Sequence, residues 1–380
     1  MKKLIKKLLP HQVINFIRKS ITRVKFYFLS LAHKSQFLSN LYYLISNEFS
    51  NEQQAVINGR KAYYESLKDI GETCALLRRN THRLEKGLIM RPRRSVFAEG
   101  FIQETVDCYK DAVKSKLLAE TEKKWATDVL DEYFIVVGST PVTVQARKVY
   151  TKARQQLLDF FEIAAEFPSE DACYKPYSYE QLPATDISFD ELKKLFIRRR
   201  SVRWYQDKKV PLELVQQAAN IASFAPSACN RQPYRFLFCN EKEKAVAIAK
   251  CAGGTTGFAE NLPAIIAIVG DLSAYPYERD RHLIYIDGSL AAMQLMLAFE
   301  TQGLSTCSIN WPEVDANERK IRKVIRLKDY ERVVMLLAVG YADASGGIPY
   351  SQKKLDKTIL EDISESVSYT HLTLPTICSV

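Results

Sequence analysis

The feature that most constrains the fold of this chain is a break at residues 167–187, with the sequence FPSEDACYKPYSYEQLPATDI. Three prolines, three tyrosines and short polar residues favour turns and extended chain here. Before the break the sequence has helical periodicity, and after it come short apolar runs typical of buried strands. A chain of 380 residues has room for about two to three domains. We therefore expect a helical region and a strand-containing region joined by a linker at 167–187.

Four segments of the first part have helical periodicity and few helix-breaking residues, namely 52–68, 100–116, 120–137 and 142–167. We assign residues 48–166 to a helical domain, and the sequence gives no role for it. A strongly basic stretch at 76–94, LLRRNTHRLEKGLIMRPRR, contains one acid, Glu85. It could grip a phosphate or an acidic partner, but a solvated helix end is the better interpretation. Its basic residues are Arg78, Arg79, His82, Arg83, Lys86, Arg91, Arg93 and Arg94.

Residues 1–47 carry nearly all of the net charge of +10, because they contain nine lysines and arginines and no acid. Within 1–34, apolar residues recur at three- and four-residue steps, with an interruption near Pro10. These residues are Ile5, Leu9, Val13, Ile17, Ile21, Val24, Phe28 and Leu31. Such a basic amphipathic helix can lie on an anionic membrane surface. The alternative is a helix that packs on its own domain and keeps its basic face in solvent.

Composition and charge exclude several classes of protein. The near balance of charge after residue 47 argues against a protein that coats nucleic acid. No apolar run approaches the roughly 18–20 residues of a membrane span, and the N-terminus lacks a secretory pattern. We expect the protein in the cytoplasm, with a possible peripheral membrane contact through residues 1–34. The eight cysteines contain no C-x-x-C pair, so we expect reduced thiols and no metal site.

The segment 188–202, SFDELKKLFIRRRSV, predicts a helix that Ser188 or Asp190 caps and that ends in three arginines. Arg203 follows Ser201 at a distance of two residues. Arginine forks and a serine hydroxyl match a phosphate dianion through charge-assisted hydrogen bonds. A solvated basic helix end is the alternative, and this segment alone does not decide between the two.

The segments that follow contain predicted helices and strands. A helix at 212–223 precedes the string APSACNRQPY at 225–234, and strands are expected at 235–239, 264–269 and 333–341. A long helix is expected at 286–302, with Asp287 as its N-terminal cap and Gly303 as its C-terminal cap. The residues GLSTC at 303–307 are expected to form a turn.

Taken in order, RRSVRWY at 199–205, APSACNRQPYRF at 225–236 and the turn at Gly303 resemble the nitroreductase-type flavin oxidoreductases over residues 188–362. The resemblance implies an α+β fold with a mixed sheet flanked by helices, and a homodimer with FMN at the subunit interface. It also implies a hydride relay from NADH or NADPH through the flavin N5 atom to a small-molecule acceptor. We therefore assign the family domain to 188–366.

The same resemblance implies roles for individual residues. Arg199, Arg200, Ser201 and Arg203 would bind the FMN phosphate and ribityl chain, and Lys353 or Lys354 would complete that group. Pro226, Ser227, Ala228 and Asn230 would lie along the isoalloxazine ring, with Asn230 and Gln232 at its polar edge. The backbone amides of Gly303 and Leu304 would approach N5. No side chain is assigned a catalytic role, because the flavin carries the chemistry.

Three positions depart from the family pattern and leave the substrate open. Ser305 stands where a second glycine is common, Ala342 and Asp343 follow Tyr341 in place of a proline, and lysines occupy the late cationic position. We hypothesise an FMN-dependent NAD(P)H oxidoreductase, and one dedicated dehydrogenation or dehalogenation is compatible with it. The alternative is a flavin-binding or flavin-less scaffold that recruits partners at the membrane surface. Residues 367–380 fit no element, so we expect a non-native or disordered tail there.

Overall fold

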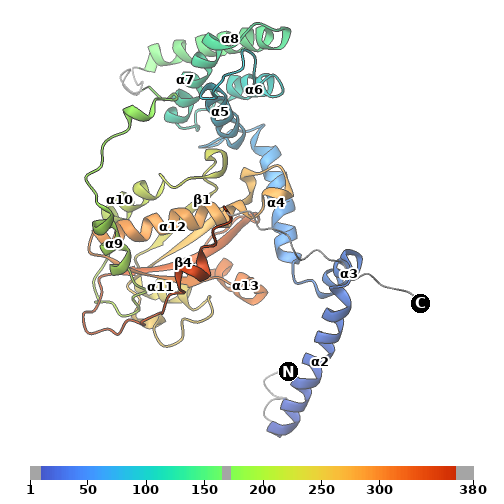
Figure 1. Ribbon diagram of the computed structural model, residues 1–380, viewed down its shortest axis with the longest axis vertical. Helices are drawn as coiled ribbons and strands as arrows, with labels where there is room; N and C mark the ends of the chain where they lie inside the picture. The colour runs from blue at the N-terminus through green and yellow to red at the C-terminus, as the bar shows by residue number, and fades with distance from the viewer. Residues whose placement is uncertain (1–9, 165–172, 365–380) are drawn as a thin grey trace.

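The computed structural model describes residues 10–164 and 173–364 and shows two lobes (Figure 1). The helical lobe contains α5 to α8, and the sheet lobe contains the four strands and the helices from α9 onward. Helix α4 runs from one lobe to the other, and an extended segment after α8 returns the chain to the sheet lobe. The expected tail at 367–380 and the first part of the linker lie outside the described residues.

The helical lobe follows the periodicity of the sequence closely. Its elements and the connecting helix are α4 (Ser50–Ser66), α5 (Ala75–Leu88), α6 (Ile102–Ala112), α7 (Glu120–Val136) and α8 (Pro141–Ala164). Leu84, Val106, Tyr109, Leu130 and Tyr133 are fully buried in the shared core of these helices. Helix α5 occupies the first half of the basic stretch at 76–94, and its buried face explains why so charged a segment is ordered.

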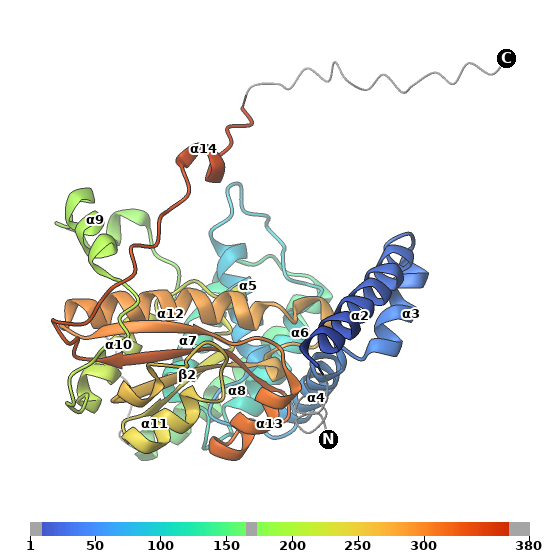
Figure 2. The same ribbon diagram turned by 90° about the horizontal axis from the view of Figure 1, so that it is seen from below.

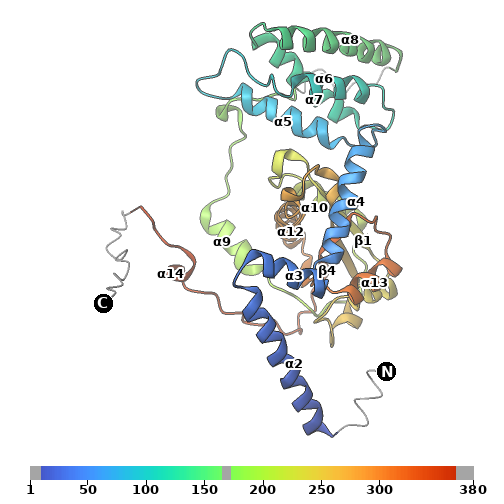
Figure 3. The ribbon, with the colours of Figure 1, turned by 90° about the vertical axis from the view of Figure 1, so that its right-hand side faces the viewer.

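Helices α2 (His11–Ala32) and α3 (Gln36–Ser46) lead away from both lobes, as Figures 1 and 3 show. The Ser35 hydroxyl accepts a hydrogen bond from the Leu38 amide and so caps α3. No residue of α3 is buried, and most described side chains of α2 are exposed. The apolar side chains of both helices therefore have little contact with the rest of the chain.

The sheet has the strand order β1-β2-β4-β3, and the neighbouring strands are antiparallel. The strands are β1 (Tyr234–Cys239), β2 (Ala264–Asp271), β3 (Ser305–Asn310) and β4 (Glu331–Gly340). A parallel bridge between Ser201 and Thr306 adds a mixed edge beside β3. The expected α+β fold is confirmed. The turn expected at 303–307 is shorter than predicted, because Ser305 already pairs with Gly340 of a strand distant in sequence.

Both faces of the sheet are covered. Ile265, Ala267 and Val269 belong to the core under α11 (Lys242–Ala249) and α13 (Asp315–Val324). Ala264, Ile266 and Ile268 belong to the core under α10 (Leu212–Ala222) and α12 (Leu283–Thr301). A strand buried on both faces has a continuous apolar sequence instead of an alternating one, as β2 does.

The segment Glu278–Thr301, which includes α12, has the length and hydropathy of a membrane span. It is the one such helix among the described residues, and half of its apolar window is buried. In Figure 2, α12 runs alongside the sheet through the middle of the lobe. Its apolar composition is explained by burial of Ala292, Leu295 and Phe299 against the strands.

Helix α4 joins the core of the sheet lobe although its sequence adjoins the helical lobe. Ala55 and Val56 pack with Leu272, Tyr275 and Ile284. A Cβ atom at Gly59 would lie 2.6 Å from the Cβ of Leu272, so the two segments are in direct contact. The Arg60 Nε atom also donates to the Pro276 carbonyl at 2.9 Å. These contacts hold the two lobes together at one side of the molecule.

Candidate functional site

The arginines after α9 (Phe189–Arg198) are held against the edge of the sheet. Ser188 caps the helix: its hydroxyl accepts from the Glu191 amide, and the Glu191 carboxylate accepts from the Ser188 amide at 2.8 Å. After the helix, the Val202 amide donates to the Thr306 carbonyl of β3 at 3.0 Å. The Trp204 carbonyl accepts from the Asp343 amide beyond β4 at 3.0 Å. The backbone of 199–205 is thereby fixed between two segments of the sheet lobe.

Three of the predicted phosphate ligands converge on Cys307 of β3. Burial raises the pKa of the Cys307 thiol, and Arg203, the Ser201 hydroxyl and Arg199 oppose this rise. The Nε atom of Arg199 is buried and has no hydrogen-bond partner among the described residues. The guanidinium of Arg203 lies 5.7 Å from the centre of the Phe258 ring. We name Arg199, Arg200, Ser201 and Arg203 the arginine group.

Arg200 points toward the segment that carries the predicted lysines. Its Nη2 atom donates to the Pro349 carbonyl at 3.1 Å and also to the Tyr350 carbonyl. Lys353 follows Tyr350 by three residues and is exposed, as is Lys354. Because an extended residue spans about 3.5 Å, these lysines lie within about 14 Å of the Tyr350 backbone.

The turn at 226–232 is fixed by a buried carboxylate on α12. Asp287 is 2% exposed, and its Oδ2 atom accepts from the Ser227 hydroxyl at 2.7 Å and from the Ala228 amide at 2.9 Å. The Ser227 hydroxyl accepts in turn from the Gln232 amide at 2.7 Å. Cys229, Asn230 and Gln232 have φ angles of 53°, 50° and 50°. Such left-handed conformations are uncommon for these residue types and persist where surrounding bonds hold them.

The expected role of Asp287 as a helix cap is wrong. Helix α12 begins at Leu283, so Asp287 lies inside the helix and not at its end. Its carboxylate instead satisfies the backbone and side chain of a segment that is distant in sequence. An aspartate inside a helix gives no sequence signal for such a partner.

Arg78 of α5 connects the helical lobe to this turn. Its Nε atom donates to the Asn230 carbonyl at 2.9 Å, and its Nη2 atom contacts the Gln232 Oε1 atom at 3.3 Å. Its Nη1 atom pairs with Glu122 of α7 at 2.9 Å. The solvated helix end expected for 76–94 is therefore wrong at Arg78, although Arg91, Arg93 and Arg94 are exposed. Charge pattern alone did not reveal that one arginine of the stretch faces another lobe.

Gly303 and Leu304 terminate α12. Gly303 has a φ of 74°, and its amide donates to the Glu300 carbonyl at 3.3 Å. The Leu304 amide donates to the Phe299 carbonyl at 2.9 Å, which completes the cap. The expected C-terminal cap is confirmed. Because both amides are already bonded, the approach to N5 predicted for them would require the cap to open.

The arginine group and the 226–232 turn lie at opposite ends of α12. Arg198, next to the arginine group, pairs with Glu300 at 3.0 Å, and the turn is bonded to Asp287. Thirteen residues of helix separate these two carboxylates, which is about 20 Å along the axis. In Figure 2, α9 lies at one end of α12 and α5 toward the other. A single chain therefore does not bring the two sets of predicted ligands together.

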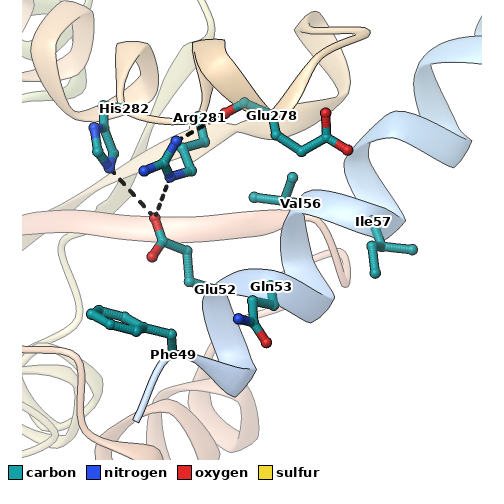
Figure 4. A pocket seen from close by; sticks show the side chains of 8 residues that line it. All are labelled: Phe49, Glu52, Gln53, Val56, Ile57, Glu278, Arg281 and His282. Carbon is teal, nitrogen blue, oxygen red and sulfur yellow. Dashed lines mark hydrogen bonds and ion pairs between the residues drawn. The ribbon is translucent and has the colours of Figure 1, made fainter. Parts of the chain in front are cut away.

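A hollow of about 650 Å³ lies between α4 and the start of α12 (Figure 4). On one side of it, the Glu52 Oε1 atom lies 3.7 Å from the Arg281 Nε atom and 3.8 Å from the His282 Nε2 atom. Phe49, Val56 and Ile57 supply its apolar wall. None of the predicted ligands lines this hollow. No group of three metal-ligating side chains occurs within 10–164 and 173–364 either.

Comparison with known proteins identifies the sheet lobe. The model of the nitroreductase family matches residues 197–257 and 240–341. Residues 197–341 of this chain match the nitroreductase family. The match includes Arg199 to Arg203, the 226–232 turn and Gly303, so the resemblance inferred from these motifs is confirmed. It begins at residue 197 and includes none of the helical lobe.

Curated relatives of this chain each match less than half of it. A protein of Archaeoglobus fulgidus named as an NADH dehydrogenase/NAD(P)H nitroreductase is 27% identical over 157 residues, which is 40% of this chain and 86% of that protein. The iodotyrosine deiodinase of Thermotoga neapolitana is 28% identical over 170 residues, 38% of this chain and 86% of that protein. The NADH dehydrogenase of Thermus thermophilus is 24% identical over 201 residues, 45% of this chain and 95% of that protein.

Among solved structures, an FMN-dependent nitroreductase from Clostridium difficile is 25% identical and has a TM-score of 0.38. It covers 44% of this chain, and 96% of its own chain is matched. A nitroreductase family protein from Streptococcus pneumoniae is 24% identical with a TM-score of 0.39, over 45% of this chain and 99% of that chain.

Proposed function

We propose that this chain is an FMN-dependent NAD(P)H oxidoreductase that reduces a small-molecule acceptor. The observation that carries the proposal is the arginine group within a nitroreductase-family domain. The buried Arg199 Nε atom has no acceptor among the described residues, and the neighbouring Arg203 guanidinium adds a second positive charge, as a phosphate site requires. When bound, FMN would supply hydride transfer from NADH or NADPH to the acceptor.

The residues of this chain would bind and orient that cofactor. Arg199 and Arg203 would neutralise its phosphate, and the Ser201 hydroxyl would donate a hydrogen bond to it. At the turn, Gln232 already donates from Nε2 to the Ser223 carbonyl at 2.8 Å and accepts from Arg78. Asn230 gives only its backbone carbonyl to Arg78, so its side-chain amide is the better donor for the polar edge of the ring. Asp287 would hold the turn in position for this contact.

The protein as isolated is expected to be yellow, or to become so when FMN is added, and NADH or NADPH should bleach the flavin absorbance. The acceptors to be tested are a nitroaromatic compound and an iodotyrosine, since the relatives are named for both activities. A colourless protein that takes up no FMN would contradict the proposed function. Flavin that neither nicotinamide reduces would favour a scaffold at the membrane surface instead.

We also propose that the active form is a homodimer. The two sets of predicted ligands lie at opposite ends of α12, so a second copy is needed to bring its turn to the arginine group. Large apolar side chains are exposed on the helices around this region. They include Phe196 and Ile197 of α9, Ile221 of α10, Phe224 after α10, and Ile286 and Leu290 of α12. Contiguous exposed apolar side chains mark protein–protein interfaces.

Light scattering after gel filtration is expected to give about twice the chain mass of 43.5 kDa. The double substitution Phe224→Asp and Ile286→Asp should shift the protein to monomer, because each places a charge in the apolar face. FMN should then be lost together with the dimer. A wild-type monomer that retains FMN would contradict this arrangement.

The location that we propose is the cytoplasmic membrane surface, with α2 and α3 as the contact. Their large apolar side chains are exposed, for example Phe16 at 71% and Phe37 at 75%. The basic residues of 1–47 stand among them without a single acid. Exposed apolar residues beside lysines and arginines are the combination that binds an anionic lipid surface.

A further inference from the structure

We propose that Arg79, Arg83 and Arg231 form an oxyanion-binding site where α5 meets the 226–232 turn. We further propose that this site holds a phosphate or carboxylate group of the acceptor, a role that rests on the proposed function. We name these three residues the seam cluster. They come from two lobes, and the family match includes only Arg231.

Contacts of α5 place the seam cluster. Arg79 and Arg83 are four residues apart and therefore share one face of the helix. Arg78 binds the carbonyl of Asn230, the residue directly before Arg231, at 2.9 Å. The Arg83 guanidinium lies 3.6 Å from the centre of the Phe101 ring, and that of Arg231 lies 4.8 Å from the centre of the Tyr275 ring. Aromatic rings thus hold two of the cations in position.

No carboxylate lies within ion-pair distance of the seam cluster among the described residues. None of its arginines forms an ion pair there, whereas the adjacent Arg78 pairs with Glu122. Glu104 acts on Arg83 through space, and its Oε2 atom accepts from Asn80 at 3.1 Å. The Oδ2 atom of Asp287 accepts from Ser227 and Ala228. Burial lowers the pKa of Arg83 most, and Arg79 and Arg231 lower it further, whereas Cys229 and Glu104 oppose this shift.

Arg231 is the most constrained member. It is 9% exposed, and its buried Nε atom has no hydrogen-bond acceptor within the described ranges. The Tyr234 and Tyr275 hydroxyls are buried and equally lack partners there. Buried polar groups are normally hydrogen-bonded, and an unpaired buried cation is costly. A bound oxyanion would accept from the guanidinium groups and neutralise their charge.

The position of the seam cluster favours the acceptor over the FMN phosphate. Arg231 lies between Asn230 and Gln232, which we predict at the polar edge of the flavin ring. The arginine group, which we assign to the FMN phosphate, lies at the other end of α12 in the same chain. Guanidinium forks match phosphate and carboxylate groups alike. The helical lobe would then select anionic acceptors, which gives it a function that the family domain lacks.

The first test is a calorimetric titration. Inorganic phosphate is added to the full chain that has been saturated with FMN, and the heat of binding gives the affinity. Arg79→Gln with Arg83→Gln should weaken phosphate binding by at least about tenfold, since two charge-assisted donors are lost. Arg91→Gln with Arg93→Gln removes two exposed charges from the same basic stretch and should leave the affinity unchanged. Equal affinity in all three proteins, or an equal loss in both variants, would overturn the site.

The second test separates the acceptor role from the site itself. The ratio of kcat/KM for 4-nitrobenzoate to that for the neutral 4-nitrobenzyl alcohol should fall at least about tenfold in the Arg79→Gln, Arg83→Gln protein. Arg79→Lys with Arg83→Lys should restore part of the ratio, because the charge returns. An unchanged ratio, or loss of FMN by the glutamine variant, would overturn the acceptor role. If neither nicotinamide reduces the flavin, the proposed function fails. The phosphate titration still tests whether the seam cluster binds an oxyanion, because it requires no turnover.

Discussion

Replacing both Arg200 and Arg203 with alanine is expected to weaken FMN binding by about 100-fold or more. Hydrogen bonds from a charged donor contribute roughly 1.5–3 kcal/mol each, and tenfold in affinity corresponds to about 1.4 kcal/mol. Arg203 lies beside Cys307 with Arg199, so its loss removes charge from the arginine group directly. Loss of Arg200 also releases the segment at Pro349 and Tyr350 that leads to the lysines. Quenching of flavin fluorescence on titration measures the affinity.

A matched control is available on the preceding helix. Lys193 and Lys194 of α9 are exposed, so Lys193→Ala with Lys194→Ala removes the same charge a few residues away. This variant should bind FMN with nearly wild-type affinity. If both variants lose FMN equally, the effect is one of net charge and the phosphate site is not the arginine group. If neither does, the phosphate is bound elsewhere.

Removal of residues 1–47 is expected to abolish binding to vesicles that contain phosphatidylserine, with a loss of at least about 100-fold. Each lysine or arginine near an anionic surface contributes about 1 kcal/mol, and this segment has nine of them. Burial of its exposed apolar side chains in the lipid interface adds to this. The truncated protein should keep its fold, because Ala32 is the one buried residue among the described side chains of 10–47. Co-sedimentation with vesicles measures the binding.

Two comparisons separate the causes of that binding. The full chain with Lys19→Gln, Arg23→Gln and Lys25→Gln keeps the apolar face and should bind about 100-fold less tightly. The wild-type chain should also bind much more weakly to vesicles of phosphatidylcholine alone, since the surface then carries no negative charge. Equal co-sedimentation of the full and truncated chains would reject the membrane contact.

The motifs at Arg199–Arg203 and 225–234 were predictive because each depends on local chemistry. The capping box at Ser188, the buried strand Ala264–Asp271 and the helix end at Gly303 are also encoded within a few residues. The contact between Arg78 and the turn was not predictable in this way. A run of arginines predicts a solvated surface unless its partner segment is known. Here the partner, Asn230, lies 152 residues from Arg78 in the sequence.

The sequence by itself determined the helical periodicity, the family of the sheet lobe and the basic N-terminal segment, since these follow from short-range patterns. Only the tertiary structure decided that Asp287 supports the turn and that Arg78 of the helical lobe binds it. It also separated the two sets of predicted ligands along α12. Charges interact through space, so their partners depend on how distant segments pack. For that reason the helices and strands can be predicted from the sequence, whereas the site that they form cannot.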